Sequence, residues 1–235
     1  MKLATLMMVL PLVAAPAWAD EALPPVAEVV AQAQKVMNKK PDSIVCKVVV
    51  DTQLLDRKGK AEHDEHRVGK ATFHGDDSDI ESQSVTRDGR ALSADDIAEE
   101  RAKVLKDKKK QKKGDDDFTP SPLDSKNAAN ESFEMVRKDT LWGRPVYVLK
   151  VSAKTKAPEH ANGTLWIDAE RFVELKGELE PSAMPPHADW IRVQEQYVPG
   201  PKDVAVPSFL HIEGAGHMLF LHKQFRTTLR WSDCR

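Results

Sequence analysis

The sequence lacks the short motifs that mark common classes of enzyme. It contains no Gly-x-Ser-x-Gly elbow, no Gly-x-Gly-x-x-Gly turn, no Walker loop and no spaced Cys/His pattern for zinc. The Gly214-Ala215-Gly216 triplet alone is interpreted as a chain reversal. We therefore predict no catalytic residue and no cofactor, and expect a protein that is not an enzyme. A hydrolase with scattered residues stays a lower-ranked alternative.

Long apolar runs are missing after residue 19. The first 19 residues have the pattern of an export signal, with Lys2 at the start, an apolar core over 3–15 and Ala17-Trp18-Ala19 before Asp20. That core is too short for a membrane-spanning helix, and no cysteine follows the predicted cleavage site to carry a lipid anchor. We predict a signal peptide at 1–19, a single domain at 20–235 and a periplasmic or secreted protein.

Neither sign of charge dominates the composition. The chain has 35 Lys and Arg against 37 Asp and Glu, a formal net charge of −2. A protein that binds nucleic acid through its phosphates carries a basic surplus. A nucleic-acid partner is therefore not expected.

Cysteine occurs only twice, at Cys46 and Cys234. An exported protein folds where disulfides persist. A bridge between the two would close a loop of nearly the whole domain and stabilise the fold by roughly 4–5 kcal/mol through loop entropy. Two unpaired thiols are the alternative, because the sequence does not show that the two residues meet.

The remaining pattern predicts an α+β fold with an antiparallel sheet. Apolar residues recur at helical spacing from Val26 to Met37, and this helix is expected to end near Asn38. Period-two alternation predicts about eight to ten strands without βαβ units. The clearest are expected at 43–55, 60–73, 80–87, 146–151, 163–168, 172–177, 190–198, 208–212 and 217–232. The polar strand 60–73 is assigned to a wet or edge position.

A charged insertion is predicted at 93–124. Ser93 and Asp96 have the spacing of an N-terminal cap, and acids lead while the lysines of 106–113 trail, as a helix dipole favours. We expect an exposed helix and then a flexible loop over 114–124. The lysines would suit anionic lipid headgroups or an acidic partner, but a solvated helix face is the default interpretation.

No metal site is predicted. His63 and His66 are three residues apart on a predicted strand, so their side chains face opposite sides. Asp115-Asp116-Asp117 lacks the spaced ligands and the glycine of a calcium loop.

Three segments between the amphipathic helix and the last long strand carry a resemblance. They are RDGRALS at 87–93, GRPVYVLKV at 143–151 and GTLWIDAERF at 163–172. Over most of 24–235 the chain resembles exported proteins of the outer-membrane lipoprotein-sorting (LolA/LolB-like) superfamily. The resemblance implies a strongly curved antiparallel sheet, an unclosed β-barrel, covered by the N-terminal helix over an apolar cavity for acyl chains. The insertion at 93–124 departs from the basic carrier pattern.

We accordingly expect a non-enzymatic periplasmic or cell-envelope carrier of lipid or lipidated protein. The lipid-binding cavity would be lined by Val26, Val29, Val30, Met37, Val48, Val50, Leu165, Ile167, Leu219 and Leu221. One alternative is an ordinary filled core at these residues. Another is an envelope protein-interaction or sensor module with the same fold and no ligand. Peripheral membrane contact and an envelope protein partner bound through 93–124 are both kept as hypotheses.

Overall fold

The structure, a computed structural model, describes residues 23–40, 42–75, 77–110, 122–124, 127–200, 204–218 and 221–235. The predicted signal peptide lies outside these ranges. Within them the chain forms two α-helices, one short 3-10 helix and a single sheet of eleven strands with antiparallel pairings. The prediction of an α+β fold with an unclosed antiparallel sheet is confirmed.

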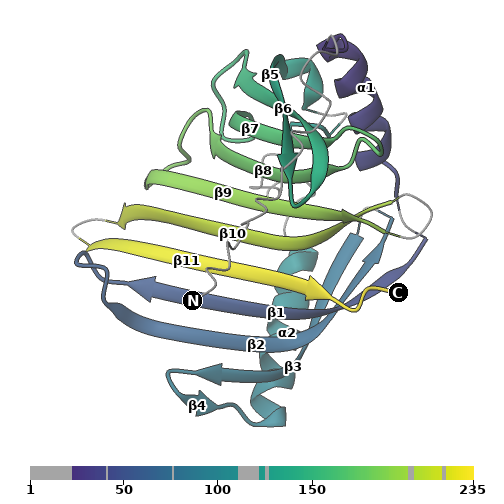
Figure 1. Cartoon of the computed structure of the whole chain (residues 1–235). Helices are drawn as coiled ribbons and strands as arrows, with labels where there is room; N and C mark the ends of the chain where they lie inside the picture. Colours follow the sequence, from purple (N-terminus) through teal and green to yellow (C-terminus); the bar gives the residue numbers. More distant parts are fainter. Residues whose placement is uncertain are drawn as a thin grey trace, which may run out of the picture.

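The strand order is β4-β3-β2-β1-β11-β10-β9-β8-β7-β6-β5 (Figure 1). The elements are α1 (Val26–Met37), β1 (Ile44–Leu55), β2 (Ala61–His74), β3 (Asp77–Arg87), β4 (Arg90–Ala91), α2 (Ala94–Lys110), η1 (Ala128–Asn130), β5 (Glu131–Leu141), β6 (Arg144–Ala153), β7 (Ala161–Asp168), β8 (Glu174–Pro181), β9 (Ala188–Pro199), β10 (Ala205–Met218) and β11 (Leu221–Ser232). The sheet stays open because β4 and β5 occupy its opposite edges, and the first and last long strands, β1 and β11, join its two halves.

The pairing register defines the two faces of the sheet. Directly paired residues project to the same side, so one row can be followed across seven strands. This row is Leu149, Leu165, Gly177, Glu195, Leu210, Leu229 and Val50. Helix α1 packs in the same core as Leu165, and α2 bonds through Glu100 to Arg67, which pairs with Val50. Both helices therefore lie on one face, the helix face, near opposite ends of the sheet (Figure 1); the other is the outer face.

Helix α1 is held by an apolar stripe and by a fixed C-terminus. Val29, Val30 and Ala33 are buried, in agreement with the predicted helical spacing. After the last turn, Asn38 Nδ2 donates hydrogen bonds to the carbonyl oxygens of Gln34, at 2.7 Å, and Leu123, at 2.9 Å. Leu123 is fully buried in the core beneath α1. The loop over 114–124 was expected to be flexible. Its described end is anchored, because the apolar side chain of Leu123 packs in the core.

Helix α2 is attached to the sheet mainly by charge. Ser93 Oγ accepts a hydrogen bond from Asp96 N, and Ser93 N and Oγ donate to the Asp96 carboxylate, so the predicted cap is confirmed. Every side chain described on α2 is exposed or half-buried. Packing against the core is therefore not what holds this helix in place.

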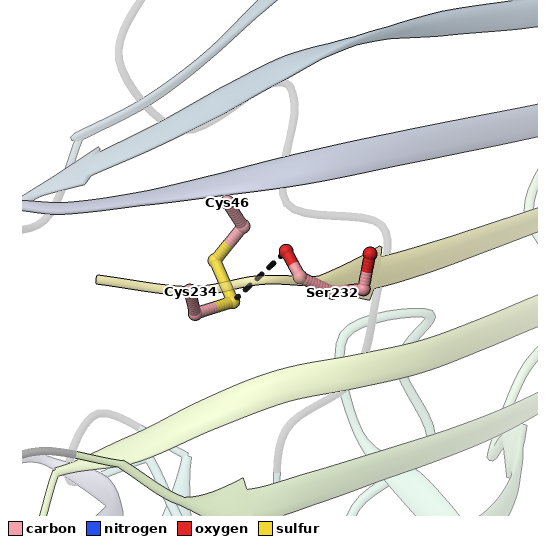
Figure 2. Close-up of a disulfide and its surroundings, with 3 residues drawn as sticks. All are labelled: Cys46, Ser232 and Cys234. Carbon is pink, nitrogen blue, oxygen red and sulfur yellow. Dashed lines mark hydrogen bonds between the residues drawn. A yellow bond between two sulfur atoms is a disulfide. The ribbon is translucent and has the colours of Figure 1, made fainter.

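Cys46 and Cys234 form a disulfide, which confirms the predicted bridge. Their Cα atoms are 4.1 Å apart, and the Cys234 sulfur also lies 3.8 Å from the Ser232 carbonyl oxygen (Figure 2). Val45 and Arg235 exchange two backbone hydrogen bonds beside the bridge. The covalent link therefore closes one end of the β1–β11 pairing.

One sequence expectation about strands is wrong. Strand β10 runs through Gly214 and Gly216 instead of turning there and continues to Met218, which pairs with Leu221 at the start of β11. Both glycines allow close packing: a Cβ on Gly214 would lie 2.8 Å from the Phe225 ring, and one on Gly216 would lie 2.5 Å from a backbone carbonyl oxygen. The polar strand β2 is exposed to solvent along its first half, in agreement with the wet position predicted for it, and it pairs with β1 and β3, so the edge alternative does not apply.

Candidate functional site

The residues predicted to line a cavity from α1 and β7 are brought together as a packed core. Val29, Val30, Leu165 and Ile167 are at most 9% exposed and contact one another through a single cluster. Val26 and Met37 lie half-buried at its margin. In this structure α1 and the sheet are thus in direct apolar contact at these positions.

The predicted lining residues from β1 and β11 lie elsewhere. Val48 is buried and Val50 half-buried on β1, on the helix face but outside the cluster beneath α1. Leu221 begins β11, and only its backbone is described; Leu219 lies outside the described residues. The ten predicted residues therefore do not form one described group.

Between the two helices the sheet presents a strip of half-buried apolar side chains, here called the apolar floor. It consists of Val50, Leu210, Ile212, Phe225 and Leu229 on three adjacent strands, β1, β11 and β10. Leu210, Ile212 and Phe225 also pack against the core cluster beneath α1, so the floor adjoins that core. Their common side follows from the pairs Val50 with Leu229, Leu229 with Leu210, and Phe225 with Gly214. Helix α1 packs chiefly along β5 and α2 along β3, so the floor lies between the strands that the helices contact.

Four hollows on the described surface are lined by both polar and apolar side chains and lie apart from the floor. One of about 300 Å³ is lined by side chains that include Glu178, Arg192 and His211, and one of about 500 Å³ includes Arg137 and Lys150. Two others, of about 350 and 310 Å³, flank the disulfide. None of these four is lined by a described residue of α1 or of the apolar floor. The floor is therefore separate from these four hollows.

A buried acid pair lies between the core beneath α1 and the floor. Glu174 on β8 is 1% exposed and Glu195 on β9 is 3% exposed. Tyr197 Oη donates a 3.0 Å hydrogen bond to Glu195 Oε2, while Glu174 Oε1 and Glu195 Oε1 are buried with no hydrogen-bond partner. Burial, and then the neighbouring Glu195, raise the pKa of Glu174 well above its ordinary value. Burial raises the pKa of Glu195 to about 7.

Sequence reasoning missed this pair for two different reasons. A bulge opposite Ile167 turns Glu174 to the helix face, so alternation along β8 could not have found it. Glu195 carried a usable signal, because it falls on the same side as Ile191 and Val193 in a clean alternation. The two acids do form an acid pair, but they lie inside the core and not in a cleft where a substrate could reach them.

The far end of the helix face carries a closed ion-pair network. Arg67 and Arg87 both bind Glu65, and both also bind Glu100 of α2, at 3.1 and 2.8 Å respectively. Burial opposes ionisation of Glu65, but hydrogen bonds from the two arginines outweigh it and lower its pKa. Two cations thus meet two anions, which leaves this cluster neutral and links α2 to β2 and β3.

His63 and His66 pair with different carboxylates, whereas His217 and His222 both pair with Asp189. His63 lies 3.1 Å from Asp88, and His66 lies 2.7 Å from Asp51, as expected for side chains on opposite faces. Among the described residues no group of three His, Cys, Asp or Glu side chains is arranged to hold a metal ion. The acidic run 115–117 lies outside those residues.

No helix in the described part of the chain is both long and apolar enough to cross a membrane.

Comparisons with known proteins concern the fold alone. No protein-family model and no curated protein matches the chain. Among solved structures it is similar to a LolA superfamily protein from Nitrosomonas europaea, with 13% identity and a TM-score of 0.39 over 91% of this chain and 94% of that one. An outer membrane lipoprotein-sorting protein domain from Vibrio parahaemolyticus matches with 13% identity and a TM-score of 0.41 over 88% and 90%. The MucA/MucB complex of Pseudomonas aeruginosa matches with 10% identity and a TM-score of 0.28 over 88% and 94%. No superfamily, ligand, partner or residue role is carried over from these matches.

Proposed function

We propose that this chain is a non-enzymatic exported binder of lipid or lipidated protein, which holds acyl chains on the helix face between α1 and α2. The observation that carries the proposal is the apolar floor, Val50, Leu210, Ile212, Phe225 and Leu229, on strands that neither helix principally contacts. A contiguous apolar patch of this kind commonly marks a ligand or partner site.

The energetics of acyl binding suit such a surface. Each methylene removed from water contributes about 0.8 kcal/mol, so a chain laid across several strands gains affinity without a charged headgroup site. Val26 and Met37, half-buried at the margin of α1, would extend the contact. Val29, Val30, Leu165 and Ile167 would join it only when α1 moves, because they are buried now.

Export is the second part of the proposal, with a cleaved signal at 1–19 and a domain at 20–235. The Cys46–Cys234 disulfide supports it, since such bonds persist where the surroundings are oxidising. Together with the predicted signal, this favours the periplasm or the exterior of the cell.

The test compares two neighbouring residues of β10 that project to opposite faces. Leu210→Gln changes the apolar floor, and Phe209→Gln changes the outer face; both side chains are half-buried. Titration of the delipidated protein with a fluorescent fatty acid should show at least about tenfold weaker binding for Leu210→Gln, corresponding to roughly 1.4 kcal/mol. Phe209→Gln should bind like the unmodified protein.

Two results would overturn the assignment. One is the absence of fatty-acid uptake together with the absence of copurified lipid by native mass spectrometry. The other is an equal loss of affinity in the two variants, which would indicate a general effect on folding and not a site on the helix face.

A protein-interaction module is the second candidate, favoured by the exposed side chains of α2. Replacing residues 94–121 by a short Gly/Ser linker separates the two functions. A lipid binder keeps fatty-acid uptake after this deletion, whereas an adaptor that uses α2 loses its envelope partner in a crosslinking pull-down.

A further inference from the structure

Glu174 and Glu195 both project over the backbone of Gly177, which has no side chain. A Cβ on Gly177 would lie 2.5 Å from Glu174 Oε1 and 3.1 Å from Glu195 Oε1, so glycine is what makes room for both carboxyl groups. Each has one buried oxygen that lacks a hydrogen-bond partner. An ordinary core position of this kind holds an apolar side chain, because buried polar atoms without partners are costly.

Two buried carboxyl groups this close to each other favour holding a proton. Both side chains lie over Gly177 and are at most 3% exposed, so two ionised carboxylates would repel each other without solvent to screen them. The Tyr197 hydroxyl donates to the remaining oxygen of Glu195 and stabilises charge there. One proton held by the pair, with any negative charge placed on Glu195, satisfies this geometry.

The groups that face the pair leave it without a compensating cation. The titratable groups that act on either carboxyl are the other carboxyl and Tyr197. Directly paired on the neighbouring strands are Ile167 on β7 and Leu210 on β10, which are apolar. A second negative charge would therefore be buried with nothing to offset it, which is costly in a core.

The pair is connected to α1 through a shared apolar cluster. Tyr197 and Val36 of α1 both pack against the buried cluster that contains Leu175 of β8, so the last turn of α1 and the residue that hydrogen-bonds Glu195 share one apolar support. Further attachments of α1 among the described residues include its apolar stripe and the bond from Asn38 to the Leu123 carbonyl.

We propose that Glu174 and Glu195 form a shared-proton latch, which keeps α1 seated on the sheet while the proton is present and loosens α1 when it is lost. The proposal rests on the proposed function in one respect, because it makes α1 the movable cover of the acyl-binding face. The direction of the effect follows from linkage. A carboxyl whose pKa is raised in the folded state stabilises that state at low pH, and this contribution is lost as the pH rises through the folded value, here about 7 for Glu195.

Amide hydrogen exchange of α1 tests the latch without any ligand. Protection factors of the amides in residues 29–37, corrected for intrinsic exchange, are measured between about pH 5.5 and about pH 7.5, where they should fall on the order of tenfold. Helix α2, at the other end of the sheet, serves as an internal reference and should not follow this change.

Three variants complete the experiment. Glu174→Gln and Glu195→Gln keep the shape of the side chain and remove its titration, so the protection of α1 should become independent of pH over this range. Glu180→Gln, which removes an exposed carboxyl from the same strand β8, should behave like the unmodified protein.

Protection of α1 in the unmodified protein that does not change with pH would overturn the latch, and this readout needs no variant to fold. A pH dependence that persists in both glutamine variants would overturn it as well. If either result is accompanied by normal fatty-acid uptake, the latch is wrong and the proposed function remains. If the protection of α1 changes with pH as expected but the protein takes up no fatty acid, only the acyl-binding role is refuted.

Discussion

At the scale of single residues, Gly163 is one of the positions where any side chain would collide with backbone atoms of a paired strand. A Cβ there would lie 2.0 Å from the Glu178 carbonyl oxygen and 3.0 Å from Leu179 Cα, both backbone atoms of the paired strand β8. We predict that Gly163→Ala lowers the free energy of unfolding by about 2–4 kcal/mol, measured by urea denaturation. Relief would require the strands to separate, because backbone atoms have no rotamer to change.

Gly89→Ala is the matched control for this prediction. Gly89 has a φ of +76° and no atom within 4 Å of the added Cβ, so only the left-handed backbone is strained. It should cost about 1–2 kcal/mol. Equal losses in the two variants would mean that strand spacing at Gly163 is not the limiting factor.

Differences between single positions also explain why the burial of the helix stripe could be predicted from the sequence and that of the acid pair could not. Val29, Val30 and Ala33 repeat at a spacing that the helix preserves, so their burial could be predicted. Glu174 depends on a bulge, and a one-residue shift in register moves a side chain to the other face. The local sequence does not specify this bulge. In the structure, Val173 and Leu175 on either side of Glu174 are both buried in one apolar cluster.

At the scale of elements, α2 is held to the sheet by Glu100, whose carboxylate binds Arg67 and Arg87, and by Arg101, which binds Asp79 and Glu81. We predict that Glu100→Gln changes the global free energy of unfolding by less than about 1 kcal/mol, because these side chains are partly solvated. The same change should clearly increase amide exchange across α2, since the helix has no buried apolar stripe to keep it attached. High salt should have a similar effect on the unmodified protein.

Glu99→Gln is the control for α2, because it removes an exposed carboxyl one residue away on the same helix. Exchange in β1 and β11 should stay unchanged in both variants. If Glu99→Gln loosened α2 as much as Glu100→Gln, net helix charge and not the network with Arg67 and Arg87 would explain the attachment.

Strand and helix ends could be predicted where a local signal marks them, and β10 shows where such signals mislead. The Ser93 and Asp96 cap placed the start of α2 correctly. Gly214 and Gly216 have the composition of a turn, but they lie inside β10 because Phe225 and the backbone at His187 approach them closely. Those contacts come from other strands, so the sequence of β10 alone does not distinguish a turn from a close approach.

At the scale of the whole molecule, the sheet consists of two parts that meet along one seam. The part from β1 to β4 is joined in the sheet to the part from β5 to β11 only by the pairing of β1 with β11, as far as the described strands show. The Cys46–Cys234 bridge closes one end of that seam, across 188 residues of sequence. The alternation in each strand predicted both partners, but not that the first and last long strands are neighbours.

Because of this arrangement, the disulfide should stabilise the fold more than a bridge within one hairpin would. We predict that the double variant Cys46→Ala with Cys234→Ala lowers the free energy of unfolding by about 2–5 kcal/mol, because the unfolded chain regains the entropy of a very long loop. Urea unfolding measures the loss, and reduction of the unmodified protein should reproduce most of it. Amide exchange should rise first at Val45 and Arg235, which exchange backbone hydrogen bonds beside the bridge, and then along β11. An unchanged urea midpoint with faster exchange confined to those two residues would show that the bridge fixes the chain end while β1–β11 pairing alone holds the halves together.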